Sequence, residues 1–120
     1  MYVFNKNRNK QQQQQQKQVI IPAPYWVSYP EMVKLAGAKP VILPTTAESN
    51  FIPTREQFVD AVNEKTRAII LCTPSNPTGS VYSLENLQMI SEIVQGHDRL
   101  LVISDEVYGK CVVSIISTAQ

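Results

Sequence analysis

Short apolar segments without polar alternation constrain the fold of this chain more than any other feature. Ala68–Cys72 and Leu100–Ile103 are apolar throughout, and Val19–Ile21 is a β-branched run that stops before Pro22. Strands that are apolar on both faces are typical of a parallel sheet that is covered by helices on each side. The sequence predicts a further strand at Pro40–Leu43, which is ended by a proline.

Helix signals separate these strands along the chain. Ser28, Thr54 and Ser83 stand at expected N-cap positions, and Glu31 and Gln57 complete capping boxes at the first two. The alternation of strands and helices predicts an α/β fold, with a partial, mostly parallel sheet and flanking helices. One helix is expected over residues 29–36, with Val33 and Ala36 on one stripe, and a second helix carries Phe58, Val59 and Val62. A third helix has one buried face formed by Leu84, Leu87, Ile90, Ile93 and Val94.

Composition divides the chain into two parts. Residues 1–18 contain seven glutamines, four basic residues and no acid, whereas residues 19–120 hold seven basic and ten acidic residues. We expect residues 1–18 to form a disordered Gln/Asn/Lys tail and residues 19–120 to form the folded unit. The positive charge of the tail suits contact with nucleic acid, but no basic surface interleaved with aromatic residues accompanies it, so a solvated tail is favoured. It also lacks the apolar stretch of a secretory signal, which leaves cytoplasm and plastid open as compartments.

Residues suited to binding follow three of the predicted strands. In open α/β sheets, ligands bind outside the carboxyl ends of the strands. Segments 22–28, 73–83 and 104–110 leave such ends, and they carry ring-bearing, amide and acidic side chains: Tyr25, Trp26, Asn76, Asp105, Glu106 and Tyr108. We therefore expect the functional site at this edge of the sheet.

Several kinds of site are disfavoured by spacing. The glycines at 37, 79, 96 and 109 are too far apart for a dinucleotide-binding fingerprint, and no phosphate-binding loop with the GxxxxGK pattern occurs. Asp105-Glu106 after an apolar strand is similar to the magnesium-binding acids of NTPases, but without a phosphate loop this pattern arises easily by chance. With one histidine and two unpaired cysteines, the chain has no zinc-binding spacing.

The remaining residue types suit a cationic aromatic ring. A carboxylate just past a buried strand can hold a protonated ring nitrogen. An aromatic side chain can stack on a planar ring, and an amide and a phenol can donate to a ring oxygen. The pyridinium ring of pyridoxal phosphate offers a partner for each of these contacts: a protonated nitrogen, a planar face and a ring oxygen. Each residue also has a structural interpretation: Trp26 as a core anchor, Asn76 as a turn residue, Asp105 as a helix cap and Tyr108 as surface packing.

Three sequence segments favour the ring-binding interpretation over the structural one. PAPYWVSYPEMVKLAGAKPV, CTPSNPTGSVY and LLVISDEVYGK resemble, in order and spacing, class I aminotransferases of the aspartate aminotransferase family. The resemblance is to the bacterial and plastid type, which includes aspartate/prephenate aminotransferases. It implies the large domain of the fold type I pyridoxal-phosphate enzymes, with Trp26 stacked on the ring, Asn76 and Tyr108 on its phenolic oxygen, and Asp105 on its nitrogen.

The same resemblance implies a reaction and partners. The reaction would move an amino group between an aspartate- or glutamate-like amino acid and a 2-oxo acid, with pyridoxal 5'-phosphate as cofactor, in a homodimer without membrane association. However, none of the seven lysines stands at the position of the family's Schiff-base lysine, and the substrate-binding arginine has no counterpart. We therefore expect the 120-residue polypeptide to be a partial large domain with little transaminase activity, exposed edge strands and an uncovered apolar face. The alternative is a non-catalytic remnant or interaction protein that keeps part of the ring site.

Overall fold

The computed structural model describes residues 16–108, and most of the predicted tail, residues 1–15, lies outside the described part, as do residues 109–120. Within residues 16–108, strands and helices alternate as the sequence predicts. Their order is β1 (Gln18–Pro22), α2 (Tyr29–Leu35), β2 (Lys39–Leu43), α3 (Arg55–Ala61), β3 (Thr66–Cys72), α4 (Leu84–Gln95) and β4 (Leu101–Asp105).

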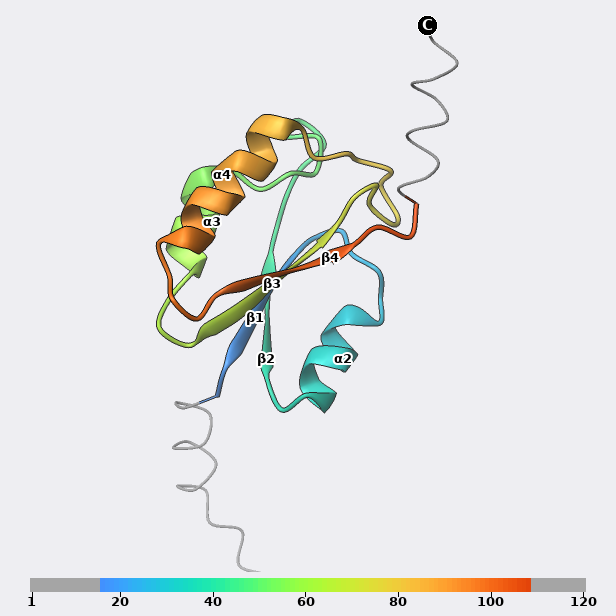
Figure 1. The fold of residues 1–120 in the computed structure, drawn as a ribbon. Coiled ribbons are helices and arrows are strands. Elements are labelled where there is room, and N and C mark those ends of the chain that lie inside the picture. Colours follow the sequence, from blue (N-terminus) through green and yellow to red (C-terminus); the bar gives the residue numbers. More distant parts are fainter. Residues whose placement is uncertain (1–15, 109–120) are drawn as a thin grey trace, which may run out of the picture.

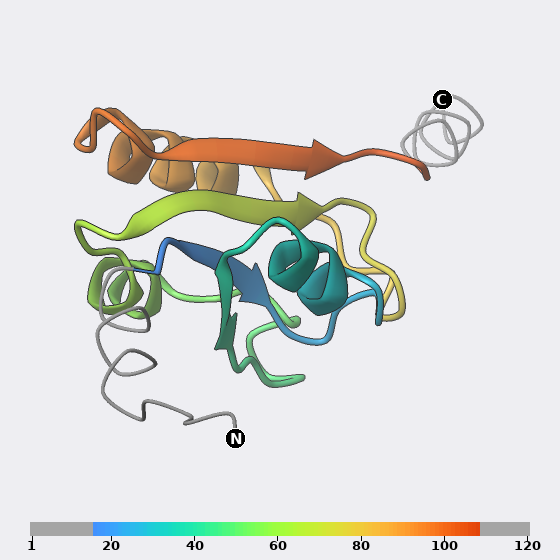
Figure 2. The same ribbon diagram turned by 90° about the horizontal axis from the view of Figure 1, so that it is seen from below.

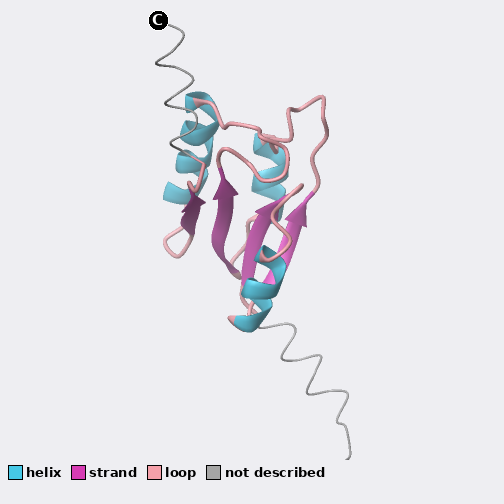
Figure 3. Cartoon of the chain, turned by 90° about the vertical axis from the view of Figure 1, so that its right-hand side faces the viewer, coloured by secondary structure: helices cyan, strands magenta, loops and turns pink. Residues whose placement is uncertain are grey.

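The four strands form one parallel sheet in the order β2-β1-β3-β4. Figure 3 shows all the arrowheads pointing toward the same edge. β3 therefore lies inside the sheet with a neighbour on each side, as its unbroken apolar sequence predicts. The predicted α/β class with a parallel sheet is confirmed.

Helices cover both faces of the sheet, with α3 and α4 on one side and α2 on the other (Figures 1 and 2). Successive side chains of a strand point to opposite faces of the sheet, so each strand contributes side chains to a core on each face. On the α3/α4 side, the first core cluster includes Ile20, Ile69 and the fully buried Phe58. On the α2 side, the second core cluster consists of Ile21, Tyr29, Val33, Ala38 and Ile70.

The helix N-termini confirm two of the three predicted caps. Thr54 accepts the backbone N–H of Gln57 at 3.3 Å, and the Gln57 side chain accepts the Thr54 N–H at 2.9 Å, so this capping box is complete. Ser83 forms the equivalent pair with Asn86. The capping box predicted at Ser28 is wrong.

Ser28 occupies the N-cap position of α2 but makes no side-chain cap bond. Its backbone is already helical, with φ −79° and ψ −21°, whereas a capping side chain requires an extended backbone at the cap. Glu31, the expected partner, pairs instead with Lys34 at 2.7 Å on the helix surface.

Burial defines which side of each helix faces the core and corrects the predicted face of α4. α2 ends at Leu35, one residue earlier than predicted, and Ala36 is its exposed C-cap residue, so Tyr29 and Val33, one turn apart, form the buried stripe. In α4, Ile90 and Ile93 are buried and Val94 packs against the core, whereas Leu84 and Leu87 are exposed. The first core cluster thus lies against the second half of α4.

β4 forms one edge of the sheet and exposes apolar side chains. Leu101, Val102 and Ile103 are all exposed, although the sequence of the strand is as apolar as that of β3. This agrees with the expected uncovered apolar face. Among residues 16–108, no helix has the length and hydrophobicity that crossing a bilayer would require.

Candidate functional site

The parallel sheet brings the ends of its strands to one edge, and the three predicted binding segments leave from that edge. The segment after β1 is joined to β2 because the Ala23 N–H donates to the Leu43 carbonyl at 2.8 Å. The segment after β3 is joined to the end of β4, where the Thr73 N–H donates to the Asp105 carbonyl at 3.2 Å. Segments that are far apart in sequence therefore share one neighbourhood.

Asp105 is the last residue of β4 and lies beside Cys72 of β3 in the strand register. Its side chain is half-buried, and each carboxylate oxygen has one donor. The Tyr29 hydroxyl donates to Oδ2, and the Val107 backbone N–H donates to Oδ1 at 3.2 Å. No lysine or arginine of residues 16–108 pairs with this carboxylate. The contact with Val107 is one that a turn-forming or a helix-capping aspartate can make, and no helix follows Asp105 within residues 16–108.

Tyr29 is a residue of the site that sequence reasoning missed. It is the first residue of α2, is 6% exposed, and belongs to the second core cluster, yet its hydroxyl reaches Asp105. Burial, together with the hydrogen bond to Asp105, raises the pKa of the Tyr29 phenol far above its ordinary value. The phenol therefore remains protonated and serves as a donor. The signal that could have found it is a tyrosine three residues after Trp26, where the chain turns from strand end into helix.

Trp26 lies in the turn before α2 and is 44% exposed, so it is not the core anchor of the structural interpretation. Its ring meets that of Tyr29 edge-to-face, with centroids 5.6 Å apart and planes at 88°. The turn itself is closed by the Tyr29 N–H, which donates to the Trp26 carbonyl at 3.1 Å. The Tyr29 ring thus contacts the indole, while much of the indole remains open to solvent.

Asn76 lies in the turn of the loop that follows β3. This loop is closed on itself, since the Gly79 N–H donates to the Ser75 carbonyl and the Ser75 N–H donates to the Ser80 carbonyl, both at 2.8 Å. Gly79 has φ +73°, a left-handed conformation that favours glycine. The half-buried amide of Asn76 makes no hydrogen bond to another residue of 16–108, and its turn position is also compatible with the structural interpretation.

Tyr108, the last described residue, is 43% exposed and stands three residues beyond Asp105. The structure joins Trp26 to Asp105 through Tyr29, and it joins the Asn76 loop to Asp105 through Thr73. None of the four predicted residues forms a hydrogen bond with another of the four. The structure thus gathers the segments, and the roles of the individual side chains remain predictions.

A small pocket lies at this edge between the segments that follow β1 and β3. Its wall includes three tyrosines, Tyr25, Tyr29 and Tyr82, together with Cys72. The Cys72 thiol donates to the Pro74 carbonyl at 3.3 Å, and burial raises the pKa of Tyr82 above its ordinary value. Trp26, Asn76, Asp105 and Tyr108 do not line this pocket, and Asp105 is connected to its wall through the hydrogen bond from Tyr29.

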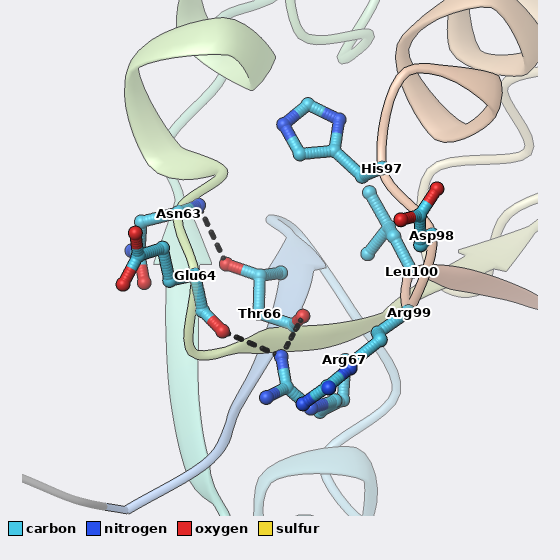
Figure 4. A pocket seen from close by; sticks show the side chains of 8 residues that line it. All are labelled: Asn63, Glu64, Thr66, Arg67, His97, Asp98, Arg99 and Leu100. Atoms are coloured by element: carbon cyan, nitrogen blue, oxygen red, sulfur yellow. Dashed lines mark hydrogen bonds between the residues drawn. The ribbon is translucent and has the colours of Figure 1, made fainter.

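A larger hollow of about 480 Å³ lies at the opposite edge, where the chain enters β3 and β4 (Figure 4). Its charged residues have both signs, with Arg67 and Arg99 beside Glu64 and Asp98. The Arg67 guanidinium is occupied by two backbone carbonyls, those of Glu64 at 2.7 Å and Thr66 at 2.8 Å. The hollow offers no tryptophan or tyrosine for stacking. The carboxyl edge is therefore the better candidate, although its pocket is smaller.

The carboxyl edge fits a planar cationic ring. A half-buried carboxylate without a described cationic partner suits a protonated ring nitrogen, and each of its oxygens retains accepting capacity beyond the single donor it has. The half-open indole can stack on the ring, and the Asn76 amide, which makes no hydrogen bond within residues 16–108, can donate to a ring substituent. These side-chain types are compatible with the pyridine ring of pyridoxal phosphate that the sequence predicts.

Comparison with known proteins gives a family. The model of the family described as "Aminotransferase class I and II" matches residues 10–119. A bifunctional aspartate aminotransferase and glutamate/aspartate-prephenate aminotransferase of Petunia hybrida is 59% identical over 90 residues, which are 75% of this chain and 19% of that protein. An aspartate aminotransferase of Bacillus subtilis is 52% identical over 92 residues, which are 77% of this chain and 23% of that protein.

Solved structures show the same fold. An aspartate aminotransferase of Thermus thermophilus with maleate has a TM-score of 0.72 at 40% identity, over 75% of this chain and 23% of that one. An aromatic aminotransferase of Pyrococcus horikoshii has a TM-score of 0.73 at 46% identity, over 77% of this chain and 24% of that one. The chain spans between 18% and 24% of the length of the curated relatives it matches.

Proposed function

Because the chain belongs to the class I and II aminotransferase family, we propose that its carboxyl edge binds the ring of pyridoxal 5'-phosphate through Trp26, Asn76, Asp105 and Tyr108. The observation that carries the proposal is the Asp105 carboxylate, which is half-buried, has one donor on each oxygen, and lacks a cationic partner within residues 16–108. A carboxylate in this environment favours a cation, and a protonated ring nitrogen supplies one.

The other three residues would orient the ring. The Trp26 indole supplies a flat apolar ring that is in edge-to-face contact with Tyr29. The Asn76 amide and the Tyr108 hydroxyl are donors that would meet the ring's phenolic oxygen, which is negatively charged when ionised. Stacking fixes the ring plane, and the polar contacts at two positions fix its rotation within that plane.

The cofactor, when bound, supplies an electron sink that stabilises negative charge on the carbon next to the amino group. Asp105 contributes by keeping the proton on the ring nitrogen, because a neutral ring would withdraw electrons less strongly. The chemistry supported by the family is amino-group transfer. We propose an aspartate- or glutamate-like amino acid as donor, a 2-oxo acid as acceptor, and a homodimer as the assembly of the whole enzyme.

We propose further that the 120-residue polypeptide binds the ring without sustained turnover. The four lysines of residues 16–108 are distant from the carboxyl edge. Lys17, Lys39 and Lys65 stand at or before the amino ends of strands, and Lys34 lines a surface hollow together with Lys39. None of these four can supply the covalent lysine of the family. A non-catalytic binding protein has the same ring contacts and differs from the enzyme in turnover alone.

A titration of the ring's binding tests the proposal. Trp26 is the single tryptophan of the chain, so its fluorescence reports directly on stacking. The suitable ligand is pyridoxamine 5'-phosphate, because its amine cannot react with surface lysines as the aldehyde of pyridoxal 5'-phosphate does. We expect saturable quenching by the wild-type chain, beyond the quenching of free N-acetyltryptophanamide.

Asp105→Asn should weaken this binding strongly. A hydrogen bond to a charged group contributes about 1.5–3 kcal/mol, which corresponds to a roughly 10- to 150-fold rise in Kd. The matched control is Glu106→Gln, the loss of an adjacent exposed carboxylate whose contact is with Ser104 at 2.9 Å. Equal effects of the two substitutions would show that binding depends on general charge and not on the Asp105 carboxylate.

A further inference from the structure

Trp26 and Asp105 of the proposed site come from different ends of the described chain, and Tyr29 contacts both. Its ring packs edge-to-face on Trp26, and its hydroxyl donates to Asp105 Oδ2, 76 residues further along the chain. The body of the ring is held by the second core cluster, since Tyr29 is 6% exposed. Tyr29 is therefore a fixed donor, whereas both of its partners are half-open to solvent.

We propose that Tyr29 is a positioning residue whose hydroxyl fixes the orientation of the Asp105 carboxylate toward the ring nitrogen. This inference rests on the proposed function and extends it to a residue that does not touch the ring nitrogen itself. It separates two contributions of one side chain: the ring of Tyr29 supports the core and Trp26, and the hydroxyl acts on Asp105.

The need for such a donor follows from the torsional freedom of aspartate. The terminal torsion of an aspartate joins an sp³ to an sp² carbon and has a broad profile, so the rotamer alone does not fix the plane of the carboxylate. The Val107 N–H restrains Oδ1 at 3.2 Å, but Val107 is itself exposed and lies in the turn after β4. The buried hydroxyl of Tyr29 on Oδ2 is the second restraint, and two restraints define the plane.

Tyr29→Phe is the direct test, since it removes only the hydroxyl and preserves the ring packing. Two probes are titrated into each protein: pyridoxamine 5'-phosphate and its analogue with C–H in place of the ring nitrogen. The wild type should prefer the probe with the nitrogen, because only this probe can pair with Asp105. Tyr29→Phe should reduce that preference about 3- to 10-fold and should leave binding of the carbon analogue unchanged, as expected for one lost hydrogen bond.

Thr45→Val is the matched control, because it also removes one hydroxyl at the carboxyl edge, and this hydroxyl donates to the Ala23 carbonyl and not to Asp105. It should leave the preference unchanged. If Tyr29→Phe weakens both probes equally, its role is only structural and the inference is overturned. If the wild type prefers the nitrogen probe and Tyr29→Phe retains the full preference, the inference fails while the proposed function stands. If the wild type shows no preference, the role of Asp105 fails and the inference fails with it.

A second measurement does not depend on the folding of the variant. In wild-type protein, the hydroxyl proton of Tyr29 should exchange slowly and be visible by NMR, because the side chain is buried and hydrogen-bonded. The nitrogen probe should shift this resonance, and the carbon analogue should shift it less. A resonance that moves equally with both probes, or with neither, contradicts the proposal.

Discussion

The N-terminal caps of α2 and α3 have the same sequence pattern and different geometry, so they give a sharp test of the structure. Thr54→Ala removes the hydroxyl that accepts the Gln57 N–H at 3.3 Å and opens a complete capping box. Ser28→Ala removes a hydroxyl that makes no cap bond. From the sequence pattern alone, the two substitutions should lower stability equally. From the structure, Thr54→Ala should lower stability and Ser28→Ala should leave it nearly unchanged.

The expected magnitudes follow from these contacts. Loss of a capping side chain costs about 1 kcal/mol, within a range of roughly 0.5–2 kcal/mol. α3 contributes the fully buried Phe58 to the first core cluster, so weakening its N-terminus should lower the free energy of global unfolding and not merely fray the helix. Thr54→Ala should therefore lose about 1 kcal/mol, and Ser28→Ala should change stability by less than about 0.5 kcal/mol.

Thermal unfolding followed by circular dichroism measures the difference. For a domain of this size, 1 kcal/mol corresponds to a Tm shift of roughly 4–8 °C. Ser83→Ala, which removes the equivalent cap of α4, is a positive control and should behave like Thr54→Ala. A Ser28→Ala variant that loses as much stability as Thr54→Ala would refute the geometry described for the start of α2.

Two further predictions concern the core and the pH dependence of folding. Phe58→Ala should lower the free energy of unfolding, measured by urea titration, by about 3–5 kcal/mol, because the side chain is 0% exposed. Val59→Ala, at the next position and 54% exposed, should lower it by less than about 0.5 kcal/mol. Similar losses in the two variants would contradict the assignment of the buried face. Hydrogen bonds from Ser83 and the helix backbone lower the pKa of Glu85 in the folded state. The ionised Glu85 side chain therefore stabilises the fold at pH values above its ordinary pKa, and this stabilisation is lost as the pH falls through the lowered pKa. Stability measured from pH 6 to pH 3 should therefore fall less steeply in Glu85→Gln than in wild type, and identical profiles would count against this contribution.

The sheet could be predicted from sequence because its strands carry strong and redundant signals. Ala68–Cys72 is apolar on both faces, and it does lie between two neighbours as β3. The edge at which the binding segments meet follows from parallel strands alone, so Trp26, Asn76 and Asp105 could be assigned to one region before the structure was known.

The features that sequence missed depend on backbone detail and on long-range contacts. The Ser28-x-x-Glu31 pattern indicates a cap, but the pattern cannot show that Ser28 already has helical dihedral angles. Tyr29 reads as one more apolar position of a helix, and its hydrogen bond to a residue 76 positions away has no local signature. The exposure of Leu101 depends on its place at the edge of the sheet, and its apolar sequence does not reveal this.

The location of ring binding is the most direct test of the central claim. In a two-dimensional ¹H–¹⁵N NMR titration with pyridoxamine 5'-phosphate, we expect saturable shifts at the Trp26 indole, the Asn76 side-chain amide and the Val107 N–H, which contacts Asp105. Arg67 and His97, in the hollow at the opposite edge, should not move. Shifts confined to that hollow, with none at the carboxyl edge, would contradict the assignment of the cofactor-ring site.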